Sequence, residues 1–214
     1  MTKYNYKKNK PIIPITIFVV GLIIYVAIKL IYHKQISSQE IDTRLKSAAA
    51  SLDLIISDSL IQNAHKKVPV NIVDYEDLRL QANKIAEIHN VIYVYVVIQS
   101  NDSVYFVVSS YITNDITKNI VTGYMDYYPE ATPAMKKSFN SGATEIFDEQ
   151  QDQWGVFHSL YIPKKTKTGI PYLLCADVKA SELTDYRLRY LVEFALTALF
   201  LFLISLPLII SLRK

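Results

Sequence analysis

Cysteine is almost absent from the sequence, with one in 214 residues, and glycine is scarce, with five. A single cysteine excludes an internal disulfide framework and a thiolate-rich metal site. Few glycines and a hydrophobic share of 50% exclude collagen-like and disordered chains. A chain of this length and composition is expected to hold one folded domain with additions at its ends.

Motifs that carry catalysis are also missing. The four histidines, at positions 33, 65, 89 and 158, have neither metalloprotease nor zinc-finger spacing. The sequence has no nucleophile motif of the form G-x-S-x-G and no glycine-rich phosphate loop. We therefore expect a protein that is not an enzyme and has no cofactor.

Two long uncharged apolar runs are present, over 11–28 and 194–212. A helix of about 20 apolar residues spans a bilayer core. We predict transmembrane helices over 11–32 and 191–212. The alternative for the first run is a cleaved signal peptide, which needs a shorter apolar core and a small-residue cleavage site directly after it. The alanines at 48–50 lie too far downstream for such a site, so an uncleaved anchor is expected.

The charges beside these runs predict the topology. Basic residues dominate 1–10 and 213–214, whereas 33–190 holds 16 Lys and Arg against 19 Asp and Glu. Because basic flanks stay in the cytoplasm, both ends are predicted inside, as a basic tail and a short C-terminal end, with the 33–190 domain outside. The formal net charge of +3 then reflects topology, and no nucleic-acid partner is expected.

The outside domain is predicted to begin with one long helix over 33–66, a segment without proline or glycine. Ile41, Leu45, Ala48, Leu52 and Ile55 form an apolar stripe at spacings of three and four residues. This stripe packs either on its own domain or against a second copy, which would make a homodimer through the 36–60 helix.

The rest of the domain reads as short helices and β-rich segments. A second amphipathic helix is predicted over 74–90, with Asp74 as its N-cap, and a short helix over 134–139. The predicted strands are 91–98, 104–111, 143–148, 154–163 and 170–178. This order indicates the α+β class, with an antiparallel five-stranded sheet and a long N-terminal helix.

The final third carries a specific pattern. The stretch DQWGVFHSLYIP (152–163) is followed by GIPYLLCADVKA (169–180), and DYYP (126–129) precedes both. The pattern resembles the D-x-W-G-x-F-x-S-x-Y-x-P … G … D-V-x-A signature of single Cache domains, which are PAS-like extracytoplasmic sensors of bacterial membrane receptors. The resemblance covers roughly 36–185.

The resemblance implies a small-molecule sensor in the bacterial inner membrane, with its domain in the periplasm or outside the cell. It also implies a cytoplasmic output of the histidine kinase, diguanylate cyclase or chemotaxis type. The sequence stops two residues after the second predicted span. We therefore expect that output in a partner protein or in another part of a longer receptor. The alternative function is an accessory membrane subunit that uses a PAS-like domain for docking.

The resemblance also implies a ligand pocket between the sheet and the 113–153 loops. Strand alternation places Gly155, Phe157, Ser159 and Tyr161 on one face, and Trp154, Val156, His158 and Leu160 on the other. The candidate ligand-binding residues are Tyr127, Tyr128, Trp154, Phe157, Ser159, Tyr161 and Asp177.

Asp177 falls at the position of the family's ligand-facing aspartate, which suggests an amine-like ligand group. The alternative is that Asp177 caps the helix that follows. The R-x-x-W-Y stretch of amino-acid-binding relatives is missing, so an α-amino acid is not expected.

Three further positions have simpler interpretations. Asp148, Glu149 and Asp152 offer oxygens that Ca²⁺ prefers, but a solvated acidic loop without a metal is expected. Cys175 is expected to be a small buried hydrophobe. His158 is expected to be a structural or surface histidine.

Overall fold

A computed structural model describes residues 12–211. The chain divides into two compact units, which are described separately. One comprises residues 39–183, and the other contains the described parts of 1–38 and 184–214. The predicted basic tail at 1–10 and the end at 213–214 lie outside the described residues.

The second unit is helical. It contains the first part of α1 (Ile12–Leu52) and nearly all of α6 (Ala180–Ser211). Within 12–211, no helix meets the combined length and apolarity needed to cross a membrane. The transmembrane spans predicted over 11–32 and 191–212 are therefore not confirmed.

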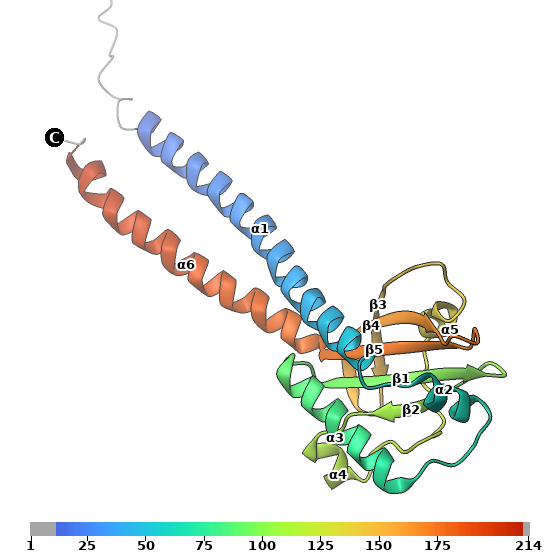
Figure 1. Ribbon diagram of the computed structural model, residues 1–214. Coiled ribbons are helices and arrows are strands. Elements are labelled where there is room, and N and C mark those ends of the chain that lie inside the picture. The colour runs from blue at the N-terminus through green and yellow to red at the C-terminus, as the bar shows by residue number, and fades with distance from the viewer. Residues whose placement is uncertain (1–11, 212–214) are drawn as a thin grey trace, which may run out of the picture. The chain divides into compact units, whose positions relative to one another are not determined.

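The 39–183 unit is built on one five-stranded sheet in which every neighbouring pair is antiparallel (Figure 1). The strand order is β2-β1-β5-β4-β3, so the first and last strands lie side by side at the centre. The strands are β1 (Tyr93–Ser100), β2 (Ser103–Ser109), β3 (Ile146–Asp152), β4 (Gly155–Lys165) and β5 (Pro171–Lys179). The α+β class and the five-stranded antiparallel sheet agree with the sequence prediction.

The long helix predicted over 33–66 is wrong at its C-terminal end. α1 ends at Leu52, and α2 (Asp58–His65) begins after a turn in which the Ile56 amide donates to the Leu52 carbonyl at 3.0 Å. Ser57 caps the new helix by accepting a hydrogen bond from the Leu60 amide at 3.2 Å. This cap stabilises a helix start inside a segment that has no proline or glycine to mark the break.

The helix predicted over 74–90 also starts earlier than expected. α3 runs over Ile72–Ile88, and its N-cap is Asn71, whose side chain accepts from the Val73 amide at 2.9 Å. Asp74 is therefore a residue of the first turn and not the cap. Two short helices follow β2, α4 (Thr113–Lys118) and α5 (Pro133–Ser138).

The apolar stripe of α1 is buried within its own unit. Ile41, Leu45, Ala48 and Leu52 are all fully buried, whereas Ile55 lies beyond the helix and is half-buried. The four side chains cannot form a seam between two copies while they are packed there. The structure therefore supports packing of the stripe on its own domain, and the homodimer through the 36–60 helix stays a prediction.

The two faces of the sheet have separate cores. Val94, Val96, Leu174, Ala176 and Val178 are buried on one face. The α1 helix reaches this side of the sheet, since Asp42 of α1 lies 3.0 Å from the His158 ring of β4. The opposite face carries a cluster rich in aromatic residues, covered by the segment that joins β2 to β3: Tyr93, Tyr95, Val97, Phe106, Tyr128, Met135, Phe139, Phe157, Tyr161, Leu173 and Cys175.

Candidate ligand-binding cavity

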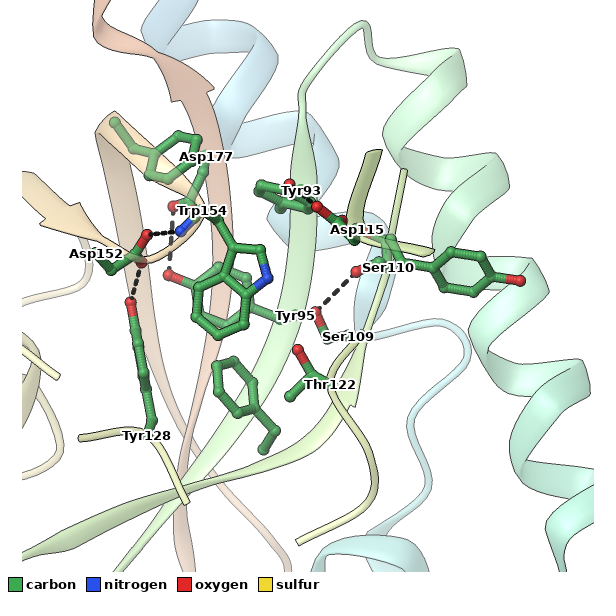
Figure 2. Close-up of a pocket in the computed structure, with 13 residues that line it drawn as sticks. Tyr93, Tyr95, Ser109, Ser110, Asp115, Thr122, Tyr128, Asp152, Trp154 and Asp177 are labelled. Atoms are coloured by element: carbon green, nitrogen blue, oxygen red, sulfur yellow. Dashed lines mark hydrogen bonds between the residues drawn. The ribbon is translucent and has the colours of Figure 1, made fainter. Parts of the chain in front are cut away.

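A cavity lies on the aromatic face of the sheet, under the chain between β2 and β4 (Figure 2). It holds about 350 Å³ of empty space, part of it open to solvent, but the centre of a water molecule can occupy only about 20 Å³. Since one water needs roughly 10–15 Å³ by that measure, the space suits ordered water and would have to widen for a larger ligand. Its lining residues are Tyr93, Tyr95, Phe106, Ser109, Ser110, Tyr111, Asp115, Thr122, Tyr128, Asp152, Trp154, Phe157 and Asp177.

Aromatic rings form most of the wall. Phe106 and Tyr128 lie 4.7 Å apart between ring centroids, and each has Trp154 at 6.0 Å in an edge-on arrangement. Tyr93 and Phe157 make a second edge-on pair at 5.6 Å. Strand alternation places Tyr93 of β1, Phe106 of β2 and Phe157 of β4 on this face of the pleated sheet, whereas Tyr128 and Trp154 come from the chain between strands.

The turn between β3 and β4 places Trp154 in the cavity. The Asp152 carboxylate accepts from the Trp154 amide at 2.9 Å and from the Gly155 amide at 3.2 Å, and the indole donates to the Ile120 carbonyl at 3.0 Å. Alternation had assigned Trp154 to the face opposite Phe157. That assignment is wrong because β4 begins at Gly155, so Trp154 belongs to the turn.

Gly155 has the backbone conformation that this turn requires. Its φ of +152° is rarely adopted by residues with a side chain, and a Cβ there would lie 3.1 Å from the Phe157 ring. The glycine thus fixes both the turn and the close approach of an aromatic wall residue.

Two of the three carboxylates in the wall are well paired. Asp115, of α4, accepts from the Tyr93 hydroxyl and from the Ile112 amide, both at 2.9 Å. Asp152 accepts from the Tyr128 hydroxyl at 2.7 Å in addition to its turn amides. Figure 2 shows Asp152 and Asp177 on one side of Trp154 and Asp115 on the other.

Asp177 is the least well paired of the three. It is only 3% exposed, and its donors are distant: the Tyr95 hydroxyl at 3.3 Å and the Gln150 amide at 3.4 Å. Ser159 lies opposite Asp177 in the β4–β5 register, and its buried hydroxyl has no hydrogen-bond partner among the described residues. These two polar groups retain hydrogen-bonding capacity in the interior.

Burial raises the pKa of Asp177 to about 8, with the nearby charge of Asp152 acting in the same direction. The Ser159 hydroxyl beside the carboxyl acts most strongly against this shift of the pKa, followed by the hydrogen bonds from Tyr95 and Gln150. The carboxyl is therefore mostly protonated at neutral pH. Burial also raises the pKa of Tyr128 and of Tyr161, so these two hydroxyls keep their protons as well.

The wall has acidic residues but no basic one. Among the described residues that line the cavity, three are aspartates and none is lysine, arginine or histidine. A bound anion would find no charge partner there, whereas a cation would find carboxylates and aromatic faces.

The structure separates the seven candidate residues. Tyr128, Trp154, Phe157 and Asp177 line the cavity. Ser159 and Tyr161 are buried on the same face of the sheet without lining it, and Tyr161 donates to the Gln150 side chain at 3.0 Å. Tyr127 is 55% exposed and packs on Tyr105 with 5.8 Å between ring centroids, away from the cavity. Ligand binding by these residues stays a prediction.

Several lining residues were not identified from the sequence. Tyr93 and Tyr95 could have been, because they alternate on the 91–98 strand. No sequence signal marks Asp115, which reaches the cavity through the fold of α4. The alternative that Asp177 caps α6 is wrong, because the Asp177 carboxyl accepts from Tyr95 and Gln150 and not from the first turn of α6.

The acidic residues 148, 149 and 152 belong to a strand, because β3 extends to Asp152 instead of ending at 148. Asp148 accepts from Thr132 at 2.6 Å, whereas Glu149 is exposed. Over the described part of the chain, no group of three or more His, Cys, Asp or Glu side chains could hold a metal ion. Cys175 is buried, and His158 is held by Asp42 and stacked on Phe147 at 5.5 Å.

Comparison with known proteins gives little similarity. No family model and no curated protein matches the chain. Among solved structures, it is similar to the sensory domain of the Campylobacter jejuni chemoreceptor Tlp3 (CcmL), a structure with isoleucine bound. The TM-score is 0.37 and the identity 11%, over 71% of this chain and 65% of that one. This similarity is too low to support an inference about the ligand or function of the present chain.

Proposed function

We propose that the chain is a sensor of small molecules whose ligand occupies the cavity between the sheet and the loops. The observation that carries the proposal is Asp177, a buried carboxyl with only two distant donors, inside an aromatic wall. Ligand sites are typically apolar cavities with a few placed polar groups. The cavity has this composition, and a role in binding without catalysis accounts for it.

We further propose that the sensor is anchored in a bacterial cytoplasmic membrane by 11–32 and 191–212, with the 33–190 domain outside. The uncharged runs and their basic flanks support this topology. The Cache-like pattern over 152–180 supports a PAS-like sensor domain that signals to a kinase, cyclase or chemotaxis output. Asp177 lies three residues before α6, so a ligand that moves β5 would act directly on the start of that helix.

The test is a thermal-shift screen of the full chain in detergent against a broad set of metabolites. A ligand present at about 100 times its Kd should stabilise the folded state by about 2.7 kcal/mol. Hits should raise the Tm of the wild-type chain and leave Asp177→Asn unchanged. A complete absence of hits, or hits that ignore Asp177→Asn, would count against a sensor that uses this cavity.

A second candidate function is an accessory membrane subunit that uses the domain for docking. The observation that favours it is the small free space, about 20 Å³ for the centre of a water molecule, which resembles a filled core. This function predicts a stoichiometric membrane partner on purification and no small-molecule stabilisation. A ligand-dependent Tm shift that requires Asp177 would exclude it as the main role.

A further inference from the structure

A groove in the 39–183 unit is much roomier than the cavity on the aromatic face. It lies between the N-terminal half of α3, the chain that joins α2 to α3, and the loop at 123–124. The centre of a water molecule can occupy about 360 Å³ of it, against about 20 Å³ in the aromatic cavity. The groove can therefore take a group much larger than water without widening. Its lining residues are Pro69, Val70, Ile72, Tyr75, Glu76, Arg79, Gly123 and Tyr124.

Arg79 lines the groove with most of its hydrogen-bonding capacity unused. The residue is 8% exposed, and a guanidinium has five N–H donors. Its Nη1 donates to Glu76 at 2.7 Å, whereas Nε is buried without a partner and Nη2 makes no hydrogen bond to a described residue. The guanidinium carbon lies 5.6 Å from the ring centroid of Tyr75 and 4.5 Å from that of Tyr111. One carboxylate and two rings thus hold the guanidinium in place and leave donors free.

Tyr75 adds a second buried donor. It is 7% exposed, and its hydroxyl has no hydrogen-bond partner among the described residues. Burial raises the pKa of Tyr75 more than the charge of Arg79 lowers it, so the hydroxyl keeps its proton. Buried polar groups are normally hydrogen-bonded, because an unpaired one is costly. Two unpaired donors in the wall of one groove indicate a bound molecule that supplies the acceptors.

The charges beside the groove favour a neutral acceptor. Glu76 already neutralises Arg79, and the charge of Asp126 lies near enough to raise the pKa of Tyr75 further. An anion would meet both carboxylates with only Arg79 to balance them. An ammonium group would meet donors where it needs acceptors. A carbonyl oxygen accepts hydrogen bonds without bringing a charge, and it fits both conditions.

Apolar surface surrounds these donors and continues past the groove. Ile72 lines the groove and is 74% exposed, and Val68 and Val73, next to lining residues in the sequence, are exposed as well. Tyr124 is fixed in the wall, because its hydroxyl donates to the Val68 carbonyl at 3.1 Å and its ring packs edge-on against Tyr75 at 5.8 Å. Exposed apolar residues beside tyrosine and arginine are typical of a surface that binds another protein.

We infer that the groove is a docking site for a partner protein, which inserts an uncharged segment with an apolar side chain. Backbone carbonyls of that segment accept from the free donors of Arg79 and from the Tyr75 hydroxyl, and the apolar side chain packs on Ile72. A peptide offers several carbonyls beside an apolar side chain, which matches two donors set in apolar surface. The groove shares no lining residue with the aromatic cavity, so the inference does not depend on the proposed ligand of that cavity.

The experiment is an NMR titration of the full chain in detergent, with isoleucine methyl groups labelled. The probes are three tripeptides, acetyl-Ala-Val-Ala-amide, acetyl-Glu-Val-Glu-amide and acetyl-Lys-Val-Lys-amide, and the small amide isobutyramide. The tripeptides share a backbone and a central valine and differ in charge. The methyl signal of Ile72 reports on the groove, and that of Ile116, which is 57% exposed on α4 and does not line the groove, reports on non-specific binding.

The neutral tripeptide should shift the Ile72 signal saturably, leave Ile116 unchanged and bind more tightly than the other three probes. Tighter binding of either charged tripeptide would overturn the choice of a neutral segment. Binding of isobutyramide as tight as that of the neutral tripeptide would assign the groove to a small amide and overturn the docking of a protein. No saturable shift with any probe would mean that the groove holds only water.

Tyr75→Phe tests the hydroxyl and keeps the ring beside Arg79. Since the hydroxyl has no partner in the fold, the variant should keep the wild-type Tm and bind the neutral tripeptide about fivefold more weakly, as for the loss of one hydrogen bond. Tyr111→Phe is the matched control, because its ring also lies beside Arg79 but does not line the groove. Unchanged affinity in Tyr75→Phe, or a fall in Tm that Tyr111→Phe does not share, would overturn the inference.

Discussion

At the scale of single residues, the most unusual position in the domain is the buried carboxyl of Asp177, which lines the cavity. A carboxyl that is 3% exposed and has only distant donors is expensive to keep charged. The protein holds it protonated, so the stability of the empty domain should depend on pH in a characteristic direction. The direction follows from the folded-state pKa, about 8, lying above the ordinary value of 3.8.

The folded state then holds one more proton than the unfolded state between about pH 4 and pH 8. The contribution of Asp177 to the free energy of unfolding is complete below pH 4 and declines by about 1.4 kcal/mol per pH unit across that window. Chemical denaturation of the wild-type chain and of Asp177→Asn at pH 5 and pH 7 isolates this contribution, because the two proteins share all other titrating groups. The wild-type stability should fall relative to that of Asp177→Asn as the pH rises, and equal pH dependence in the two proteins would mean that Asp177 is not protonated in the folded state.

Gly155 is a second residue whose role can be tested alone. Gly155→Ala places a Cβ 3.1 Å from the Phe157 ring at a φ of +152°, and we expect a loss of roughly 1–3 kcal/mol in the free energy of unfolding. Gly142→Ala is the matched control, because a Cβ there meets nothing within 4 Å and the backbone is unstrained. A Gly155→Ala protein as stable as Gly142→Ala would show that the turn can rearrange.

At the scale of elements, the last part of α1 packs on its own domain, because the apolar stripe from Ile41 to Leu52 is buried there. Arg44 extends this role at the surface: it donates to the carbonyls of His89 and Asn90 after α3, and pairs with Glu182 in the first turn of α6 at 2.5 Å. One arginine thus connects α1 to the ends of two other elements within the 39–183 unit.

Leu45→Ala tests the packing of α1. Leu45 is fully buried, and truncating it should cost about 2–5 kcal/mol in the free energy of unfolding, because a cavity remains. Leu54→Ala makes the same chemical change two residues beyond the helix, where the side chain is 87% exposed, and should cost less than about 0.5 kcal/mol. Chemical denaturation of the two variants measures the difference. Similar small losses would indicate that the stripe is not buried in solution.

The elements also show which features the sequence alone could predict. All five strands were found, because runs such as VIYVYVVI are β-branched and aromatic and lie between turn residues. The end of α1 at Leu52 was missed, because nothing in the sequence distinguishes Ser57 from the other serines nearby. Its role as the N-cap of α2 is visible only in the folded chain. The extension of β3 to Asp152 was missed because its polar residues, Glu149 among them, have no apolar alternation.

At the scale of the whole molecule, a cavity can be predicted only in part from sequence. Alternation along β4 correctly put Phe157, Ser159 and Tyr161 on one face, and Asp177 was recognised from the pattern around it. Tyr127 and Tyr128 are neighbours with the same side chain, yet one is exposed and the other lines the cavity. The loop path decides between them, and that path depends on contacts between distant parts of the chain.

The proposed sensor function requires a ligand to enter the cavity on the aromatic face of the sheet. Trp154 is the only tryptophan in the chain and lines that cavity, so its fluorescence reports directly on occupancy. The measurement is a fluorescence titration of the full chain with any compound that raises its Tm. We predict a saturable change in Trp154 emission, with the same Kd as the thermal stabilisation and absent in Asp177→Asn. A compound that stabilises the protein but leaves Trp154 emission unchanged would bind elsewhere and contradict the account.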